Sequence, residues 1–429
     1  MSAPENLPHI DTGLLRFLTC GNVDDGKSTL IGRLLFDTKT ILADTLSAIE
    51  KTSQRRGMEA VDLSLLTDGL QAEREQGITI DVAYRYFSTG TRKYIIADAP
   101  GHEQYTRNMV TAASTANLAI ILVDARKGMQ TQTRRHSYLA HLVGIPHLVV
   151  AINKMDLVDY DQATFERIRA DYLAFAQKLG IPDVRFIPLS ALNGDMIVDR
   201  GDRLDWYDGP TLLEVLEATP TAPTAPTSIA DSFRFPVQYV CRPHDSANPE
   251  LHDYRGFMGR VESGEITVGD AVTVLPSGQS SRIAAIEIGG EPLPHAIHEQ
   301  SVTLRLEDEI DISRGDMIVK SGEEPPALRE VEANVCWLAE TPLSPARTWV
   351  LRHTTREVKA KVIQIDYRLD LNTLDNAPAT TLEMNDIARL TLKLAQPIFG
   401  DHYADNRASG AFILIDESTN TTVGAGMIR

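Results

Sequence analysis

Residues 21–28 have the order G-x-x-x-x-G-K-S, which is the spacing of a phosphate-binding loop. An apolar run at residues 14–20 precedes this loop, and a helical pattern at residues 29–36 follows it. Glycine lets the backbone turn tightly, so that amide N–H groups and the helix start point at phosphate oxygens. We expect Lys27 to neutralise phosphate charge and Ser28 to bind Mg²⁺. The predicted contacts with a nucleoside triphosphate are Gly21, Asn22, Val23, Asp24, Asp25, Gly26, Lys27, Ser28 and Thr29.

A second polar cluster begins where the apolar run at residues 94–97 ends. A carboxylate at a strand end can hold Mg²⁺ through water, so Asp98 is the predicted acidic residue of the metal site. Gly101 can offer its backbone N–H to the γ-phosphate, so we expect hydrolysis to be sensed there. The predicted segment consists of Asp98, Ala99, Pro100, Gly101 and His102.

Two further segments indicate which base is bound. Residues 153–156 and 190–192 each follow an apolar strand pattern, and open parallel sheets bind ligands at the carboxyl ends of their strands. The Asp156 carboxylate can accept hydrogen bonds from N1–H and the exocyclic amine of guanine, whereas adenine has neither donor. A backbone N–H of the second segment can reach the base O6. The sequence therefore predicts GTP, with base contacts from Asn153, Lys154, Met155, Asp156, Ser190, Ala191 and Leu192.

Residues 73–80 form a strongly charged segment, and taken alone such a segment is a solvated helix end. Here it follows a long insertion after the phosphate loop and precedes an apolar-rich run at residues 82–87, which is the position of switch I in GTPases. Thr79 is therefore the predicted second hydroxyl ligand of Mg²⁺, beside Ser28 and Asp98.

Together these segments resemble the translation-factor family of GTPases, which includes elongation factor Tu and elongation factor 1 alpha. In that family, the histidine that matches His102 orients the attacking water. Apolar residues that match Val23 and Ile78 form a gate in front of this water. The resemblance thus implies that His102, Thr79 and Gly101 are the catalytic residues.

The residues of the phosphate loop resemble one group of GTPases within this family more than the others. Elongation factor Tu-like loops usually carry histidines where this chain has Asn22 and Asp25, whereas G-N-V-D-D-G-K-S-T is typical of the large GTPase subunits of heterodimeric sulfate adenylyltransferases. Residues 101–109, 206–216, 235–240, 308–316 and 422–427 are also similar to those subunits, and residues 242–252 form a longer loop than that family usually has. The resemblance implies that GTP hydrolysis is coupled to formation of adenosine 5′-phosphosulfate and pyrophosphate from ATP and sulfate in sulfate assimilation.

The sequence contains neither a second phosphate loop nor the S-G-G-x-D-S segment with which ATP pyrophosphatases hold ATP. We therefore expect a separate small ATP-binding subunit to carry adenylyl transfer. Two alternatives remain open at this point: an elongation-factor-like GTPase that delivers aminoacyl-tRNA, and a regulatory GTPase that acts only as a binding switch.

Composition limits the partners of the chain. Its 429 residues carry a formal net charge of −17 at pH 7, which argues against non-specific binding to nucleic acid. A local basic run at residues 347–361 has the alternation of a solvated sheet face. Three widely spaced cysteines favour a reducing compartment, and no run has the length of a membrane span. We expect a cytoplasmic protein with no nucleic-acid and no membrane partner.

The elements that must position these residues change in kind along the chain. Strand and helix patterns alternate up to residue 217, which predicts an α/β P-loop GTPase domain with a doubly wound, mostly parallel sheet. Short β-branched runs between glycine turns then predict two small antiparallel β-barrel domains, with no helix expected in either. The predicted boundaries are an N-terminal extension at 1–13, the GTP-binding domain at 14–217, a Pro/Thr linker at 218–228, and barrels at 229–325 and 326–429.

Overall fold

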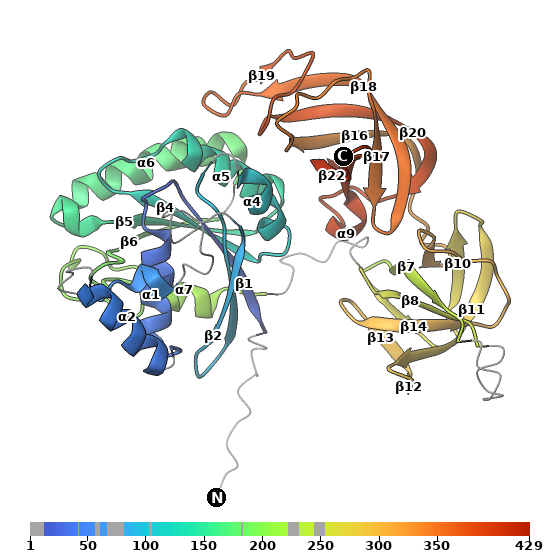
Figure 1. The fold of residues 1–429 in the computed structure, drawn as a ribbon, viewed down its shortest axis with the longest axis horizontal. Helices are drawn as coiled ribbons and strands as arrows, with labels where there is room; N and C mark the ends of the chain where they lie inside the picture. Colours follow the sequence, from blue (N-terminus) through green and yellow to red (C-terminus); the bar gives the residue numbers. More distant parts are fainter. Residues whose placement is uncertain are drawn as a thin grey trace, which may run out of the picture. The chain divides into compact units, whose positions relative to one another are not determined.

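The computed structural model describes residues 13–41, 43–55, 61–66, 81–102, 105–181, 183–221, 231–243 and 254–429. The chain divides into two compact units (Figure 1). The first contains Met1–Thr224 and Leu371–Leu374, and the second contains Ala225–Asp370 and Asp375–Arg429.

The first unit is built on a six-stranded sheet with the order β2-β3-β1-β4-β5-β6. Its pairs are parallel except at the edge, where β2 runs antiparallel to β3. Every residue of the central strand β4 is buried, because helices cover both faces of such a sheet and favour a continuous apolar run. The strands are β1 (Leu15–Cys20), β2 (Ala83–Ser88), β3 (Lys93–Asp98), β4 (Leu118–Asp124), β5 (His147–Asn153) and β6 (Val184–Pro188).

Helices α4, α5 and α6 gather on one face of this sheet, and α1 and α7 lie on the other (Figure 1). The core on the second side joins buried side chains of α1 and α7 to β1 and β3. Among the described residues, no helix is long and apolar enough to cross a membrane. The helical segments are α1 (Lys27–Asp37), α2 (Ala43–Arg55), η1 (Leu63–Leu66), α4 (Thr106–Ala113), α5 (Thr131–Leu142), η3 (Met155–Val158), α6 (Gln162–Leu179) and α7 (Leu212–Ala218).

The second unit begins with an antiparallel ring in the order β10-β15-β7-β8-β14-β11, closed by pairing of β11 with β10. Buried residues of these strands form one apolar core. The ring strands are β7 (Arg234–Cys241), β8 (Gly256–Arg260), β10 (Ala271–Leu275), β11 (Gln279–Ile288), β14 (Ser301–Leu306) and β15 (Met317–Lys320). The short strands β9 (Glu265–Thr267), β12 (Glu291–Leu293) and β13 (His295–Ile297) lie outside it.

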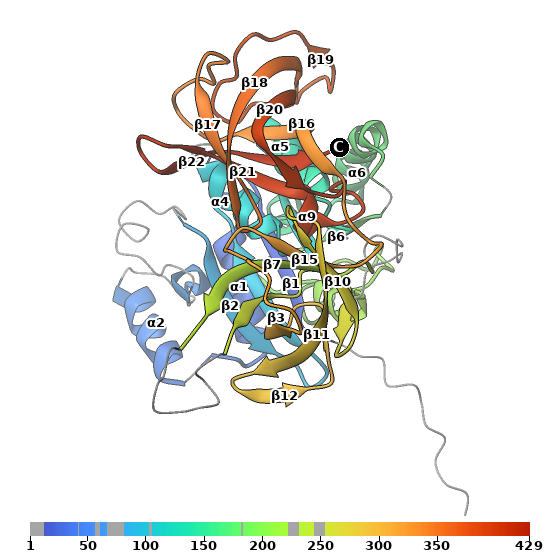
Figure 2. The ribbon, with the colours of Figure 1, turned by 90° about the vertical axis from the view of Figure 1, so that its right-hand side faces the viewer.

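A second antiparallel ring has the order β17-β21-β22-β16-β20-β18 and is closed by pairing of β18 with β17. Figure 2 shows β16, β20 and β18 side by side, as their pairing requires. These two rings and the preceding sheet confirm the predicted fold class. The strands are β16 (Ala327–Trp337), β17 (Thr348–His353), β18 (Arg356–Leu369), β20 (Ile387–Phe399), β21 (Ala411–Asp416) and β22 (Thr421–Ile428), with β19 (Asn376–Ala377) beside β18.

One expectation about the barrels is wrong, because the helix α9 (Arg407–Gly410) lies between β20 and β21. The Asn406 side chain accepts hydrogen bonds from Ala408 N and Ser409 N, which is the capping contact that starts a helical turn. A single well-capped turn thus fits into a barrel connection.

The two rings of this unit meet at a buried ion pair. Arg234 of β7 contacts Asp401 through Nε and Nη2 at 3.0 and 3.1 Å, and the two side chains are 3% and 4% exposed. Ser409 Oγ also donates to Asp401, and Asn406 Nδ2 donates to Ser263 Oγ at 2.9 Å. Charged and polar groups from both barrels are therefore satisfied inside this junction.

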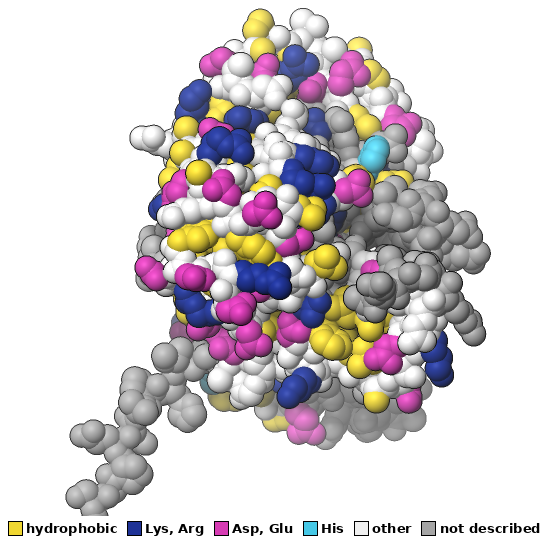
Figure 3. Space-filling model, turned by 90° about the vertical axis from the view of Figure 1, so that its left-hand side faces the viewer, with side chains coloured by type: hydrophobic (Ala, Val, Ile, Leu, Met, Phe, Trp, Pro, Cys, Tyr) yellow, Lys and Arg dark blue, Asp and Glu magenta, His cyan; other side chains and the backbone are white. Residues whose placement is uncertain are grey.

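Surface charge is mixed in sign. On the face drawn in Figure 3, acidic and basic side chains are interspersed. The basic run at residues 347–361 alternates exposed and buried positions along β17 and β18, so its predicted solvated sheet face is confirmed. Within it, Arg352 pairs with Glu357 and Lys359 pairs with Glu417.

Candidate GTP-binding site

The phosphate loop connects β1 to α1 and is closed by its own hydrogen bonds. Asn22 N–H donates to Asp25 Oδ2 at 2.7 Å, and Leu30 N–H donates to Gly26 O at 2.9 Å where the helix begins. Gly26 has φ 93°, in the left-handed region, and a Cβ there would lie 2.5 Å from Asn153 Nδ2. Only glycine suits this close approach between the loop and the predicted base segment.

Asp25 lies inside the loop and is 3% exposed. Burial raises the pKa of this carboxyl, while the bond from Asn22 and the charge of Lys27 act in the opposite direction. Asp25 Oδ2 accepts the hydrogen bond from Asn22 N–H, so this predicted nucleotide contact also stabilises the conformation of the loop.

The second polar segment, residues 98–102, lies against the phosphate loop beside Lys27. A Cβ on Gly101 would lie 2.7 Å from Gly21 O and 2.8 Å from Lys27 Nζ, so these three residues converge. Asp98 is buried at the end of β3, where Thr19 Oγ1 donates to it at 3.3 Å. Ser28 and Thr29 lie in the first turn of α1.

Hydrogen bonds join three segments at the predicted base end: the phosphate loop, residues 153–156 and residues 190–192. Asn153 Nδ2 donates to Asp25 O at 2.8 Å, and Asn153 Oδ1 accepts from Ala191 N–H at 3.0 Å. Ser190 Oγ donates to Asp156 Oδ1 at 2.6 Å. Ser190 thus orients the Asp156 carboxylate, whose oxygens keep further acceptor sites for a base. Leu192 is 61% exposed beside this turn.

Lys154 links the base segment to the loop. Its Nζ donates to Asp24 O and lies 3.1 Å from Asp124 Oδ2. Lys154 itself has φ 62°, and Met155 begins the short helix η3 with its side chain buried. The two segments predicted from separate parts of the sequence are thus in direct contact.

Residues 73–80, which include Thr79 and the gate residue Ile78, lie outside the described residues. Residues 244–253, most of the longer loop, also lie outside them. His102 is described, and its backbone oxygen accepts a hydrogen bond from Tyr105 N–H at 3.0 Å, just before α4 begins at Thr106.

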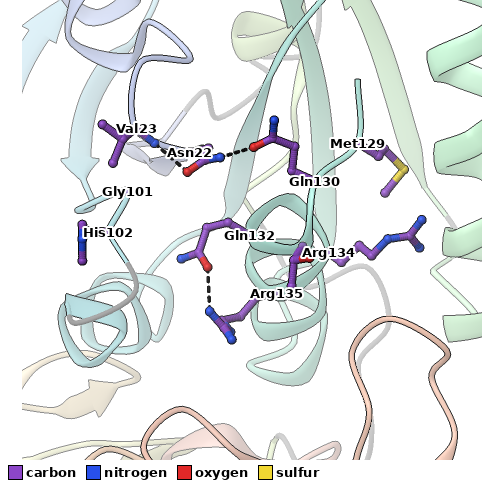
Figure 4. A pocket seen from close by; sticks show the side chains of 10 residues that line it. Asn22, Val23, Gly101, His102, Met129, Gln130, Gln132, Arg134 and Arg135 are labelled. Atoms are coloured by element: carbon purple, nitrogen blue, oxygen red, sulfur yellow. Dashed lines mark hydrogen bonds between the residues drawn. The ribbon is translucent and has the colours of Figure 1, made fainter. Parts of the chain in front are cut away.

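A cavity of about 660 Å³ opens beside Gly101 and His102, two of the predicted catalytic residues. Val23, Gly101 and His102 line one side, and the first turn of α5 lines the other (Figure 4). The Asn22 side chain donates to Gln130 Oε1 across this space. The phosphate loop is therefore bonded directly to the residue that precedes α5.

A chain of hydrogen bonds runs through the start of α5. Arg135 Nη1 donates to Gln132 Oε1 at 2.7 Å, which turns the Gln132 amide nitrogen toward His136 Nε2 at 3.0 Å. His136 must then accept and be neutral. Burial, the nearby Lys27 and Arg135 agree with this, since they lower its pKa from 6.5 to about 3.

Models of two known protein families match this chain. The model of the elongation factor Tu GTP binding domain matches residues 12–221, and that of the GTP-eEF1A C-terminal domain-like family matches residues 330–429. Sulfate adenylyltransferase subunit 1 of Laribacter hongkongensis is 54% identical over 98% of this chain and 86% of that protein. This chain belongs to the sulfate adenylyltransferase subunit 1 family.

Two further comparisons differ in coverage or similarity. The bifunctional enzyme CysN/CysC of Mycobacterium tuberculosis is 52% identical to this chain. The match covers 97% of this chain and 67% of the bifunctional enzyme. A crystal structure of sup35 complexed with GMPPNP has 24% identity and a TM-score of 0.43, with coverage of 97% of this chain and 94% of that chain.

Sequence reasoning missed Asp124, which no predicted segment includes. Its side chain is fully buried, with Arg126 Nη2 at 2.6 Å and Lys154 Nζ at 3.1 Å. Burial alone raises the pKa of Asp124, but the bonds from Arg126 and Lys154 hold it well below its usual range. Asp124 ends β4, so the strand-end rule applied to Asp98 and Asn153 would have found it.

Proposed function

We propose that this chain is the GTP-hydrolysing subunit of sulfate adenylyltransferase. Its GTP hydrolysis would be coupled to formation of adenosine 5′-phosphosulfate and pyrophosphate from ATP and sulfate. The observation that carries the proposal is the family membership over 98% of the chain, together with a loop that is bonded to the predicted guanine segment. Coupling is chemically reasonable because the mixed anhydride formed is more reactive than the phosphoanhydride broken.

In this proposal, the two ends of the site have separate roles. Asp156, oriented by Ser190, selects guanine, while Lys27 and the loop amides hold the phosphates. His102 orients the attacking water and Gly101 senses the γ-phosphate. The convergence of Gly101 and Lys27 supports these assignments.

The residues around Ser28 and Asp98 fit Mg²⁺, because hydroxyl and carboxylate oxygens are the donors that this ion prefers. Ser28, Asp98 and Thr79 would hold the ion, and Mg²⁺ when bound would neutralise charge on the phosphates. Thr19 keeps the Asp98 carboxylate at the strand end through its hydroxyl.

The partner in this proposal is a small ATP-binding subunit that carries adenylyl transfer. The name of the relatives, subunit 1, supports a multi-subunit enzyme. A reducing compartment, the cytoplasm, fits three free cysteines. Burial raises the pKa of the Cys20 thiol to about 12, which fits a packing role for that residue rather than a reactive one.

The test is sulfate-dependent pyrophosphate release by the chain, by a candidate small subunit, and by their mixture, each with and without GTP. We expect product only from the mixture, and more of it with GTP. A Thr79→Ala variant should still bind the partner but lose the stimulation by GTP. Product from the chain alone, or a mixture indifferent to GTP, would contradict the proposal, and co-purification of tRNA would favour an elongation-factor role.

A further inference from the structure

The turn that follows β6 is bonded to a side chain of α1 that no predicted site includes. Arg33 Nε donates to Ala191 O at 3.3 Å, and Arg33 Nη2 donates to Leu192 O. These two carbonyls belong to the segment whose backbone N–H groups are predicted to reach the base O6. Arg33 therefore contacts the predicted base end of the site from a position 158 residues earlier in the chain.

The guanidinium of Arg33 is itself held in place. Asp37 Oδ1, one helical turn later, lies 3.6 Å from Arg33 Nη1, and the two side chains are 20% and 19% exposed. The centroid of the Phe36 ring lies 5.8 Å from the guanidinium carbon. The three nitrogens of the guanidinium thus have separate partners, two carbonyls and one carboxylate. A planar fork of five N–H donors can do this, whereas the single nitrogen of a lysine cannot.

Other hydrogen bonds fix the far end of the turn. Asp195 O accepts from Ser190 N–H at 3.2 Å, and Asp195 Oδ2 accepts from the Tyr160 hydroxyl at 2.6 Å. Neither bond involves the carbonyls of residues 191 and 192. Within the part of the chain that the structure describes, Arg33 supplies the hydrogen bonds to these two carbonyls. The near side of the turn therefore depends on Arg33 for its position.

Helix α1 joins this contact to the phosphate end of the site. The helix begins at Lys27 of the phosphate loop. Arg33 lies six residues further on, which is roughly 9 Å along the helix axis. A guanidinium anchored on this helix keeps the turn at a set distance from the loop, as a nucleotide that contacts both of them requires.

We propose that Arg33 is a positioning residue for guanine recognition, which keeps the backbone N–H groups of residues 190–192 within reach of the base O6. The inference rests on the proposed function, because that function places guanine between Asp156 and this turn. Asp156 is oriented separately, by Ser190 Oγ at 2.6 Å. Loss of Arg33 should therefore disturb the recognition of O6 and leave the recognition of the 2-amine by Asp156 intact.

The test measures the affinity of the full-length chain for three nucleotides by competition against a fluorescent GDP analogue. They are GDP, inosine diphosphate, which lacks the 2-amine, and 2,6-diaminopurine riboside diphosphate, which carries an amine in place of O6. The diaminopurine ring also lacks N1–H, a change that acts at Asp156 in every variant alike. Inosine diphosphate checks that Asp156 itself is unaffected.

We expect Arg33→Ala to lower the preference for GDP over the diaminopurine nucleotide by about ten-fold, the value of one hydrogen bond to a charged group. The preference for GDP over inosine diphosphate should stay unchanged. Arg33→Lys should lose less of the first preference, because an ammonium group can bond to one of the two carbonyls.

Arg200→Ala is the matched control. Arg200 also donates to two loop carbonyls, Gly209 O at 2.9 Å and Tyr207 O. Residues 207–209 include no predicted nucleotide contact, so both preferences should stay as in the unmodified chain. Urea unfolding of each variant measures any loss of stability separately from nucleotide choice.

An Arg33→Ala variant that weakens all three nucleotides by the same factor, or that keeps the original preference over the diaminopurine nucleotide, would overturn the inference. If this variant does not fold, Arg33→Lys decides: an unchanged preference overturns the inference and a reduced one supports it. The titrations involve neither hydrolysis nor a partner subunit. A chain whose choice of base depends on Arg33 but that gives no GTP-stimulated product with the small subunit would therefore refute the proposed function alone.

Discussion

At the base end of the nucleotide site, Asn153 bonds to both the phosphate loop and Ala191, and Ser190 holds Asp156 at 2.6 Å. At the opposite end, Gly101 and His102 border a cavity of about 660 Å³. The proposed base end is thus held by hydrogen bonds within the folded chain, whereas the proposed hydrolytic end borders open space. Nucleotide choice and nucleotide turnover should respond differently to substitution.

The largest effect is expected at the base end. Asp156→Asn should move preference from GTP to xanthosine triphosphate by about 10⁴-fold, because a mismatched buried hydrogen bond discriminates strongly. Competitive titration of both nucleotides measures this ratio. Asp159→Asn, at an exposed position three residues on, is the control. Unchanged GTP affinity in the Asp156 variant would contradict the assignment.

At the hydrolytic end, His102→Ala should slow single-turnover hydrolysis by roughly 10²- to 10³-fold and leave GTP affinity nearly unchanged. The reason is that positioning of water stabilises the transition state and not the bound nucleotide. His295→Ala, at an exposed position of β13, should hydrolyse GTP at the normal rate. A His102 variant with ordinary hydrolysis would remove this residue from the catalytic set.

The hydrogen-bond chain beside the cavity predicts a pH effect on stability. His136 stays neutral in the folded chain because burial lowers its pKa from 6.5 to about 3, whereas the unfolded chain takes up a proton below 6.5. Stability should therefore fall as the pH drops from 6.5 toward 3, by up to about 1.4 kcal/mol per pH unit from this residue. Urea unfolding of the unmodified chain and His136→Gln between pH 7 and 5 measures the difference. Equal slopes in the two chains would show that His136 is not the cause.

The smallest effect is expected inside the loop. Burial raises the pKa of Asp25, so its favourable contribution belongs to the protonated form and is lost as the pH rises from 3.8 through the raised pKa. Asp25→Asn keeps an acceptor for Asn22 N–H and removes the buried charge. The variant should unfold at a higher temperature than the unmodified chain at pH 7, with the gain shrinking as the pH falls. A lower unfolding temperature at pH 7 would show that the charge itself supports the loop.

Those parts of the site that consist of continuous stretches of the chain could be predicted from the sequence. The loop, the base segments and β4 are each continuous in the chain, so their residue types report their structure directly. Strand β4 has seven buried residues in succession and is recognisable as an apolar run. The mostly parallel sheet and the two antiparallel barrels were predicted from such patterns, whereas the number and order of the strands came from the structure.

The polar lining of the cavity could not be predicted in the same way. All seven residues at positions 130–136 are polar or charged, a pattern that is typical of a solvated helix. Only the contact of Asn22 with Gln130, 108 residues later in the chain, gives them a place beside the phosphate loop. The turn α9 was missed for another reason, since the Asn406 cap is a local signal that the barrel pattern outweighed.

The junction of Arg234 and Asp401 has a consequence for how the second unit opens. These residues are 167 positions apart and belong to different barrels, yet each is the other's charge partner in a buried setting. Unfolding one barrel alone would remove one partner of this pair, and loss of one partner from a buried ion pair costs about 3–5 kcal/mol while the other charge stays buried. Partial opening of one barrel is therefore disfavoured, and backbone amides in the cores of both should exchange with deuterium at similar free energies. A protease would then meet the two barrels as a single cooperative body.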